Sequence, residues 1–302
     1  MKRRTTTIII SVILFLFALG LTLYPVVANY VNQKYASEVH TAYLEVVEQA
    51  DDTALQEAKE MAVCYNQAII PGAAATDAYS KEAILSASED YDHQLNVTGD
   101  GIMGYIEIPN ISVNLPIYHG TGSDSLERGV GHLLGSSLPV GGESTHAILT
   151  GHSGMASQKM FTDLVQVEVG DVFYLHILDE ILAYQVRDLN TVLPHDTSLL
   201  GISTGEDLCT LITCTPYGIN THRLLVTGSR IAYEEAETIV EETVLEEQPR
   251  STWEEKYVAG IVAGIFAVLI VTLVIGIIIQ IRKLVAENRR YGKYRGGRHV
   301  QK

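Results

Sequence analysis

Two long apolar stretches stand near the ends of the chain. The first covers residues 8–28 and follows a basic N-terminus, and the second covers residues 258–281 and has no polar face. At about 1.5 Å of rise per helical residue, each can cross the roughly 30 Å hydrocarbon layer of a bilayer. The pattern predicts a transmembrane helix over 258–281. Over 8–28 it predicts a transmembrane anchor or a signal peptide, because Val26 and Ala28 suit a cleavage site.

Residues 29–70 carry a helical pattern. Thr53-Ala54-Leu55-Gln56 fits a capping box. The apolar side chains that follow recur on one helical face, namely Leu55, Ala58, Ala62, Tyr65 and Ile69. Pro71-Gly72 ends the helix. Residues 71–98 are small and polar, and predict a loop with at most one short helix.

Short strand-like runs fill residues 99–232. The expected strands are 104–108, 111–117, 147–150, 172–178, 181–186, 208–213 and 224–227. Gly, Pro, Asn and Asp separate them, and many short strands at this spacing predict a barrel or a sandwich. The strongly acidic residues 233–257 then predict a solvated linker to the second apolar stretch.

The charges divide the chain into a middle and two ends. Of the 36 acidic residues, 35 lie in the middle segment, together with only ten of the 21 Lys and Arg residues. Because basic flanks stay in the cytoplasm, we expect cytoplasmic segments at 1–7 and 282–302 and an external middle segment. Nucleic-acid binding is excluded, since there is no basic stripe outside the termini. Three distant cysteines also exclude a disulfide scaffold or a zinc cluster.

Three residues at strand ends are candidates for chemistry. Cys214 ends one predicted strand before a Pro-Gly turn, and Arg223 opens the next, so a strand–turn–strand pair can set them side by side. His152 follows another strand between flexible Gly residues. A catalytic Cys needs a proton partner such as His. The pattern alone leaves a structural Cys and an ordinary surface Arg open, and it does not choose among ten His residues.

The motifs around these residues resemble those of the sortase family. The sequence TLITC ends at Cys214 and precedes Arg223, TGHSG contains His152, and GDGIMGYIEIPNI begins at Gly99. Together with the second apolar stretch, they resemble the class C, pilus-assembling group. The resemblance implies a mainly β fold, a closed eight-stranded barrel over 99–232 with N-terminal helices and flanking transmembrane helices. It also implies a catalytic triad of His152, Cys214 and Arg223, with no metal or organic cofactor.

The resemblance further implies a membrane-anchored cysteine transpeptidase on the outer face of a Gram-positive cell. Such an enzyme cleaves an LPxTG-like sorting signal between Thr and Gly and forms a thioacyl intermediate on its Cys. It then transfers the acyl group to a lysine amine of a pilin subunit. The implied partners are therefore pilin subunits and the cell membrane.

Class C sortases also carry a lid with an Asp-Pro-aromatic motif before the barrel. The matching position is Asp77-Ala78-Tyr79, where Ala replaces Pro. The resemblance implies that Asp77 pairs with Arg223 and that Tyr79 covers Cys214. The remaining cysteines, Cys64 and Cys209, are interpreted as packing residues.

Two alternatives remain open from the sequence. The chain is a housekeeping sortase that anchors proteins to peptidoglycan, or it is an inactive barrel used as an adhesin or scaffold. The second apolar stretch and the lid-like segment argue against the first alternative. The intact Cys, His and Arg argue against the second.

Overall fold

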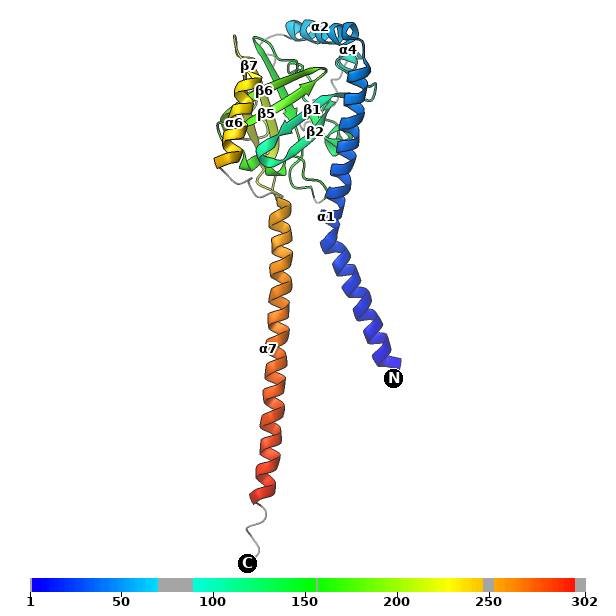
Figure 1. Ribbon diagram of the computed structural model, residues 1–302, viewed down its shortest axis with the longest axis vertical. Coiled ribbons are helices and arrows are strands. Elements are labelled where there is room, and N and C mark those ends of the chain that lie inside the picture. Colours follow the sequence, from blue (N-terminus) through cyan, green and yellow to red (C-terminus); the bar gives the residue numbers. More distant parts are fainter. Residues whose placement is uncertain (1, 70–88, 156, 247–252, 297–302) are drawn as a thin grey trace, which may run out of the picture. The chain divides into compact units, whose positions relative to one another are not determined.

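The computed structural model describes residues 2–69, 89–155, 157–246 and 253–296. The chain forms two units, Met1–Ser251 and Thr252–Lys302. In the first unit, eight strands close into a barrel that carries helices before its first strand and after its last (Figure 1). The predicted closed eight-stranded β-barrel is therefore confirmed.

The strands are β1 (Ile102–Ile108), β2 (Val113–His119), β3 (Val130–His132), β4 (Thr145–Thr150), β5 (Val172–Ile177), β6 (Glu180–Val192), β7 (Asp207–Thr215) and β8 (His222–Ile231). The helices are α1 (Lys2–Gln49), α2 (Asp52–Ala68), α4 (Glu89–His93), α5 (Ser123–Arg128), α6 (Tyr233–Glu246) and α7 (Trp253–Gly296), with 3-10 turns η1 (Pro109–Ile111) and η2 (Thr162–Gln166).

The strands follow one another around the barrel in the order β1-β2-β3-β4-β7-β8-β6-β5. The β2–β3 and β4–β7 pairs are parallel, and the other neighbours are antiparallel. Parallel neighbours need long connections, and the one between β4 and β7 contains β5 and β6. This pairing places β4 and β7, which are distant in the sequence, side by side in the barrel.

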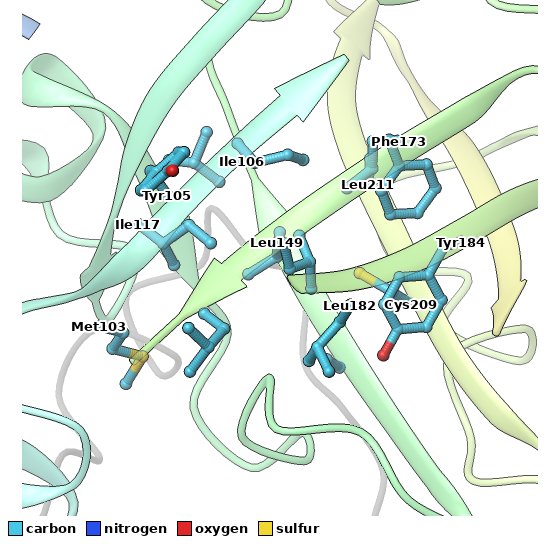
Figure 2. Packing of buried hydrophobic residues seen from close by; sticks show 14 of the residues in the cluster. Met103, Tyr105, Ile106, Ile117, Leu149, Phe173, Leu182, Tyr184, Cys209 and Leu211 are labelled. Carbon is cyan, nitrogen blue, oxygen red and sulfur yellow. The ribbon is translucent and has the colours of Figure 1, made fainter. Parts of the chain in front are cut away.

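The barrel interior is an apolar core that contains one of the three cysteines. Cys209 is fully buried in the same cluster as Tyr184 and Leu211 (Figure 2). Burial holds the pKa of its thiol well above the usual value, so it stays protonated. The interpretation of Cys209 as a packing residue agrees with this placement. Cys64 is exposed, however, and its predicted packing role is wrong.

Cys64 lies outside the core because of the way α2 is turned. The buried side chains of α2 are Leu55, Ala58, Ala62 and Asn66. Leu55, Ala58 and Ala62 are buried as predicted, whereas Tyr65 and Ile69 are only partly buried. Cys64 lies two residues from Ala62, on the other side of the helix. The helix also begins earlier than predicted, at Asp52, with Asp51 as its N-cap residue. The predicted capping box at Thr53 is wrong, because Thr53 lies within the first turn.

Three strands differ most from the predicted set, and one of them is β8, which covers His222–Ile231 instead of the predicted 224–227. β3 was not predicted because it has only three residues and a glycine at its centre. Gly131 is needed there, since a Cβ atom would lie 2.4 Å from the Gly120 carbonyl oxygen. β6 extends to Val192, beyond the predicted end at Val186, where the β6–β8 ladder contains a register shift.

The predicted acidic linker begins as a helix. In α6, Ala236 is fully buried and packs with Val172, Tyr174 and Ala183 on the outside of β5 and β6. The acidic side chains, among them Glu234 and Glu235 in the first turn, suit a helix N-terminus. Residues 233–246 are therefore part of the barrel unit rather than a solvated connection.

Two helices are long and apolar enough to cross a membrane. The candidate spans are Val12–Gln49 of α1 and Glu255–Val285 of α7. The mean hydropathy over an 18-residue window is 2.1 in the first helix and 3.1 in the second. α1 continues without a break from the predicted span at 8–28 into residues 29–49. The segment after the first span is therefore the same helix, and it carries the span directly to the barrel.

Candidate active site

Three neighbouring strand ends bring the predicted catalytic residues to one level of the barrel. Cys214 on β7 is the register partner of Arg223 on β8. In the parallel β4–β7 pair, Thr150 is the register partner of Ile212. His152 and Cys214 each lie two residues beyond that pair. The fold therefore places His152, Cys214 and Arg223 in one row across the ends of β4, β7 and β8.

The contacts just past the end of β4 keep this row in register. The Gly151 backbone nitrogen donates to the Ile212 carbonyl at 3.0 Å. The Thr213 hydroxyl donates to the Gly151 carbonyl at 2.8 Å. β7 and the residues after β4 thus remain adjacent up to the residues that immediately precede His152 and Cys214.

The row lies on the outer face of the barrel rather than in its core. Strand side chains alternate between the two faces, and Cys209 and Leu211 point into the core. Cys214 has the opposite parity and shares its face with Ile212. Ile212 belongs to a small buried cluster outside the barrel with Leu133, Ile148, Leu200 and Leu225. This apolar cluster borders the site on one side and keeps water from the strand surface beneath it.

A short loop holds the backbone of His152. The carbonyl of His152 accepts a hydrogen bond from the Phe161 backbone nitrogen at 3.0 Å. Gly151 is required beside it, since a Cβ atom there would lie 2.6 Å from the Phe161 ring. The Gly154 nitrogen donates to the Thr162 hydroxyl at 3.1 Å, which closes the loop again. His152 is therefore carried by a constrained loop and not by a free one.

The surroundings of His152 favour its neutral form. Burial lowers the pKa of the imidazole, and the Glu127 carboxylate on α5 partly opposes this by raising it. Gln158 links the loop to α5 by donating to the Glu127 carbonyl at 2.7 Å. Sequence reasoning missed Glu127, because an exposed charge on a short helix carries no signal that it acts electrostatically on a histidine distant in the sequence.

Arg223 is tied to the turn between β7 and β8. Its guanidinium donates to the carbonyls of Asn220 and His222 at 3.4 and 3.3 Å. The turn itself exposes two apolar side chains, Tyr217 and Ile219, at 62% and 67%. An accessible cation and an apolar surface therefore flank Cys214, which is itself partly exposed.

The remaining predicted site residues, Asp77 and Tyr79, lie outside the described residues. No metal was predicted, and within 2–69, 89–155, 157–246 and 253–296 no three His, Cys, Asp or Glu side chains form a group that suits a metal ion. The site therefore combines the thiol of Cys214, the imidazole of His152 and the guanidinium of Arg223. This is the set of groups used for nucleophilic acyl transfer.

Comparison with known proteins identifies the family. The sortase domain family matches residues 106–231. Sortase A of Streptococcus agalactiae is 30% identical over 139 residues, which are 45% of this chain and 53% of that protein. The chain thus spans about half the length of this curated relative.

Solved structures align over nearly their whole length. Sortase C of Streptococcus pneumoniae, described with pilin substrate specificity, is 43% identical with a TM-score of 0.59. The match covers 65% of this chain and 97% of that one. Sortase C-1 of Actinomyces oris is 45% identical with a TM-score of 0.55, over 59% of this chain and 99% of that one. With this barrel and these matches, the chain belongs to the sortase family, whose members are cysteine transpeptidases.

Proposed function

We propose that this chain is a membrane-anchored transpeptidase that joins pilin subunits. The observation that carries the proposal is the pairing of Cys214 with Arg223 on adjacent strands, together with the Thr150–Ile212 pair, two residues beyond which lie His152 and Cys214. A thiol at a strand end is held rigidly while the turn beyond it leaves it accessible to a peptide. The same row supports an active enzyme rather than an inactive barrel.

In the proposed reaction, the Cys214 thiolate attacks the carbonyl carbon of Thr in an LPxTG-like signal. The Thr–Gly bond breaks as protonated His152 gives its proton to the departing glycine nitrogen, and a thioester remains on Cys214. A lysine amine then attacks the thioester and gives a proton back to His152, so that the thiolate is restored. Arg223 donates hydrogen bonds to the oxyanion that forms in both steps.

Similarity to sortase C structures supports pilin as the acceptor protein. Those matches have 43–45% identity and cover 97–99% of the solved chains, whereas the Sortase A match has 30% identity and covers 53% of the relative. A pilin lysine is therefore the preferred acceptor over a cell-wall peptide. We also propose that α1 and α7 anchor the enzyme in the cell membrane, with the barrel outside and both termini in the cytoplasm.

The test uses the full chain in detergent with an LPxTG-like peptide and two competing acceptors, a lysine-containing pilin fragment and a cell-wall peptide amine. Mass spectrometry should detect the peptide, without its glycine part, attached to Cys214. The joined product should form with the pilin fragment in preference to the cell-wall amine. Preference for the cell-wall amine would overturn the assignment to pilin assembly.

Two cysteine variants make the test specific. Cys214→Ala should abolish both the adduct and the product, because it removes the nucleophile. Cys64→Ala is the matched control, since it removes an exposed thiol elsewhere and should retain activity. Product formation by the Cys214→Ala variant would contradict the proposed reaction.

A further inference from the structure

Helix α1 contacts the loop that follows His152. We call residues 153–155 and 157–161 the His152 loop. The Asn29 side-chain oxygen accepts a hydrogen bond from the Lys159 backbone nitrogen at 2.7 Å. One turn further along α1, the Asn32 side-chain nitrogen donates to the Ser157 carbonyl at 3.0 Å. These two asparagines follow directly on the predicted span that ends at Ala28.

The same part of the loop is fixed from its other side by a buried lysine. The Lys159 side chain is only 7% exposed, and its ammonium lies 3.4 Å from the Asp163 carboxylate, which is 4% exposed. The ammonium also donates to the Ile111 carbonyl at the end of η1. Moving the ammonium away would separate the buried Asp163 carboxylate from its cation, which is strongly destabilising. Lys159 thus fixes the loop to the barrel, and the asparagines fix it to α1.

Two hydrogen bonds connect residues 157–159 to the backbone around His152. Phe161, two residues after Lys159, donates its backbone N–H to the His152 carbonyl at 3.0 Å. Gly154 is bonded to the Thr162 hydroxyl at 3.1 Å. The loop is therefore closed at its base, and a movement of residues 157–159 passes to the backbone that carries the His152 imidazole.

We propose that Asn29 and Asn32 are positioning residues for His152, through which the membrane-span helix holds the proton-transferring imidazole in place. This inference rests on the proposed function, because it assigns His152 a part in the reaction. Neither asparagine acts on substrate. Their amides are suited to the task since one side chain can accept from, and the other donate to, the backbone of a loop. Asn29 is 1% exposed, so its contact is shielded from water.

The discriminating variant is Asn32→Asp in the full chain. It keeps the size of the side chain but turns a carboxylate oxygen toward the Ser157 carbonyl, where a donor stood at 3.0 Å. Gln33→Glu is the matched control, because it adds the same charge on the neighbouring, exposed position of α1. Asn29→Leu is the second variant, and it removes the acceptor from the buried Lys159 N–H.

The measurements are kcat and KM for transfer per reactive Cys214, and the pH dependence of kcat. We expect both asparagine variants to lower kcat about 10-fold with KM unchanged, as misplacement of a reacting group does. We also expect the pH at which kcat falls to shift by about half a unit or more, since the burial of the imidazole and its distance from Glu127 change. Gln33→Glu should match the wild type in both.

The readouts separate positioning from a loss of folding. Partial unfolding lowers the number of reactive thiols but leaves kcat per thiol and the pH profile unchanged, and that result would overturn the inference. An equal loss in the Gln33→Glu variant would overturn it as well, because any added charge on α1 would then suffice. A wild-type chain without Cys214-dependent transfer would instead refute the proposed function.

Discussion

At the scale of single residues, the proposed chemistry depends on the proton held by His152. Burial lowers the pKa of its imidazole, and the Glu127 carboxylate raises it. The imidazole must be protonated to release the glycine amine, so this step is lost as the pH rises through the pKa of His152. The exposed carboxylate on α5 therefore widens the pH range in which the proposed acid can act.

Glu127→Gln tests this electrostatic role. Without the carboxylate, the pKa of His152 falls further, and the decline of kcat on the alkaline side should move to lower pH. Asp124→Asn is the matched control, because it removes a carboxylate from the same short helix and should leave the pH profile unchanged. The profile should be measured at low salt, since exposed charges are screened. Equal profiles for the two variants would exclude Glu127 as the cause.

Arg223→Lys tests the need for a planar donor. A lysine keeps the charge but lacks the fork of parallel N–H groups, so kcat should fall by about 10²-fold or more, as on the loss of an oxyanion donor. Arg187→Lys is the control. Arg187 lies on β6 and forms an exposed ion pair with Glu206, the residue immediately before β7. Wild-type turnover by Arg223→Lys would show that charge alone is sufficient.

At the scale of elements, the close approach of β4, β7 and the Phe161 ring leaves no room beside His152. Gly151→Ala would place a Cβ atom 2.6 Å from that ring, so either the ring or the His152 loop must move. We expect a loss of about 1–3 kcal/mol in the free energy of unfolding and a lower kcat per reactive thiol. Gly201→Ala, with nothing within 4 Å of the added atom, should change neither. An unchanged kcat in Gly151→Ala would show that the loop tolerates the shift.

A second element contact links α4 to β3 through a fully buried histidine. Tyr91 lies 2.9 Å from Nδ1 of His132, and the Ser137 carbonyl lies 2.9 Å from Nε2. With Nε2 donating to Ser137, the tyrosine hydroxyl donates to Nδ1, and the ring is neutral. Burial lowers the pKa of His132 to about 4. The contact is therefore present at neutral pH and is lost in acid.

This histidine should make the barrel sensitive to acid. The unfolded chain takes up the proton near pH 6.5 and the folded one near pH 4, so stability falls as the pH is lowered across this range, by about 3 kcal/mol in total. His132→Gln, which can still donate to Ser137 and accept from Tyr91, should flatten the dependence of the unfolding midpoint on pH. His195→Gln, at an exposed position, should not. A slope in His132→Gln equal to that of the wild type would contradict this account.

The elements that the sequence predicts are those that depend on a local pattern of side chains rather than on contacts between distant segments. The long strands and the buried face of α2 follow from periodicity, because their side chains alternate between core and solvent. β3 depends on a parallel contact at Gly131, and the docking of α6 depends on a surface formed by β5 and β6. Neither contact leaves a local pattern. Local signals likewise placed Cys214 and Arg223 on adjoining strands, whereas His152 was chosen among ten histidines by resemblance to a family.

At the scale of the whole molecule, the distribution of charge follows the positions of the two apolar helices. Nearly all the acidic residues lie between the predicted spans at 8–28 and 258–281, and eight basic residues follow the second one. α7's span of 31 residues is about 46 Å long as a helix, longer than the hydrocarbon layer. An enzyme held at both ends would meet membrane-bound substrates in the plane of the bilayer.

The orientation can be measured with single cysteines in a Cys64→Ala, Cys214→Ala background, where the remaining Cys209 is buried. Ser198→Cys should react with a membrane-impermeant maleimide in intact cells, because it lies in an exposed loop of the barrel. Thr5→Cys and Asn288→Cys should react only after permeabilisation. Moving the basic tail outward would require eight Lys and Arg residues to cross the bilayer, which opposes the reverse topology.

Each introduced cysteine tests the location of a different part of the chain. Permeabilised cells serve as the positive control, in which all three positions should be labelled. Labelling of Asn288→Cys in intact cells would contradict a cytoplasmic tail. If Thr5→Cys is absent from the mature chain while Ser198→Cys is labelled, residues 8–28 act as a signal peptide, and α7 alone holds the enzyme. In that case the asparagines that follow Ala28 would begin the mature protein, and their contact with the His152 loop would fix its N-terminus rather than transmit a constraint from the membrane.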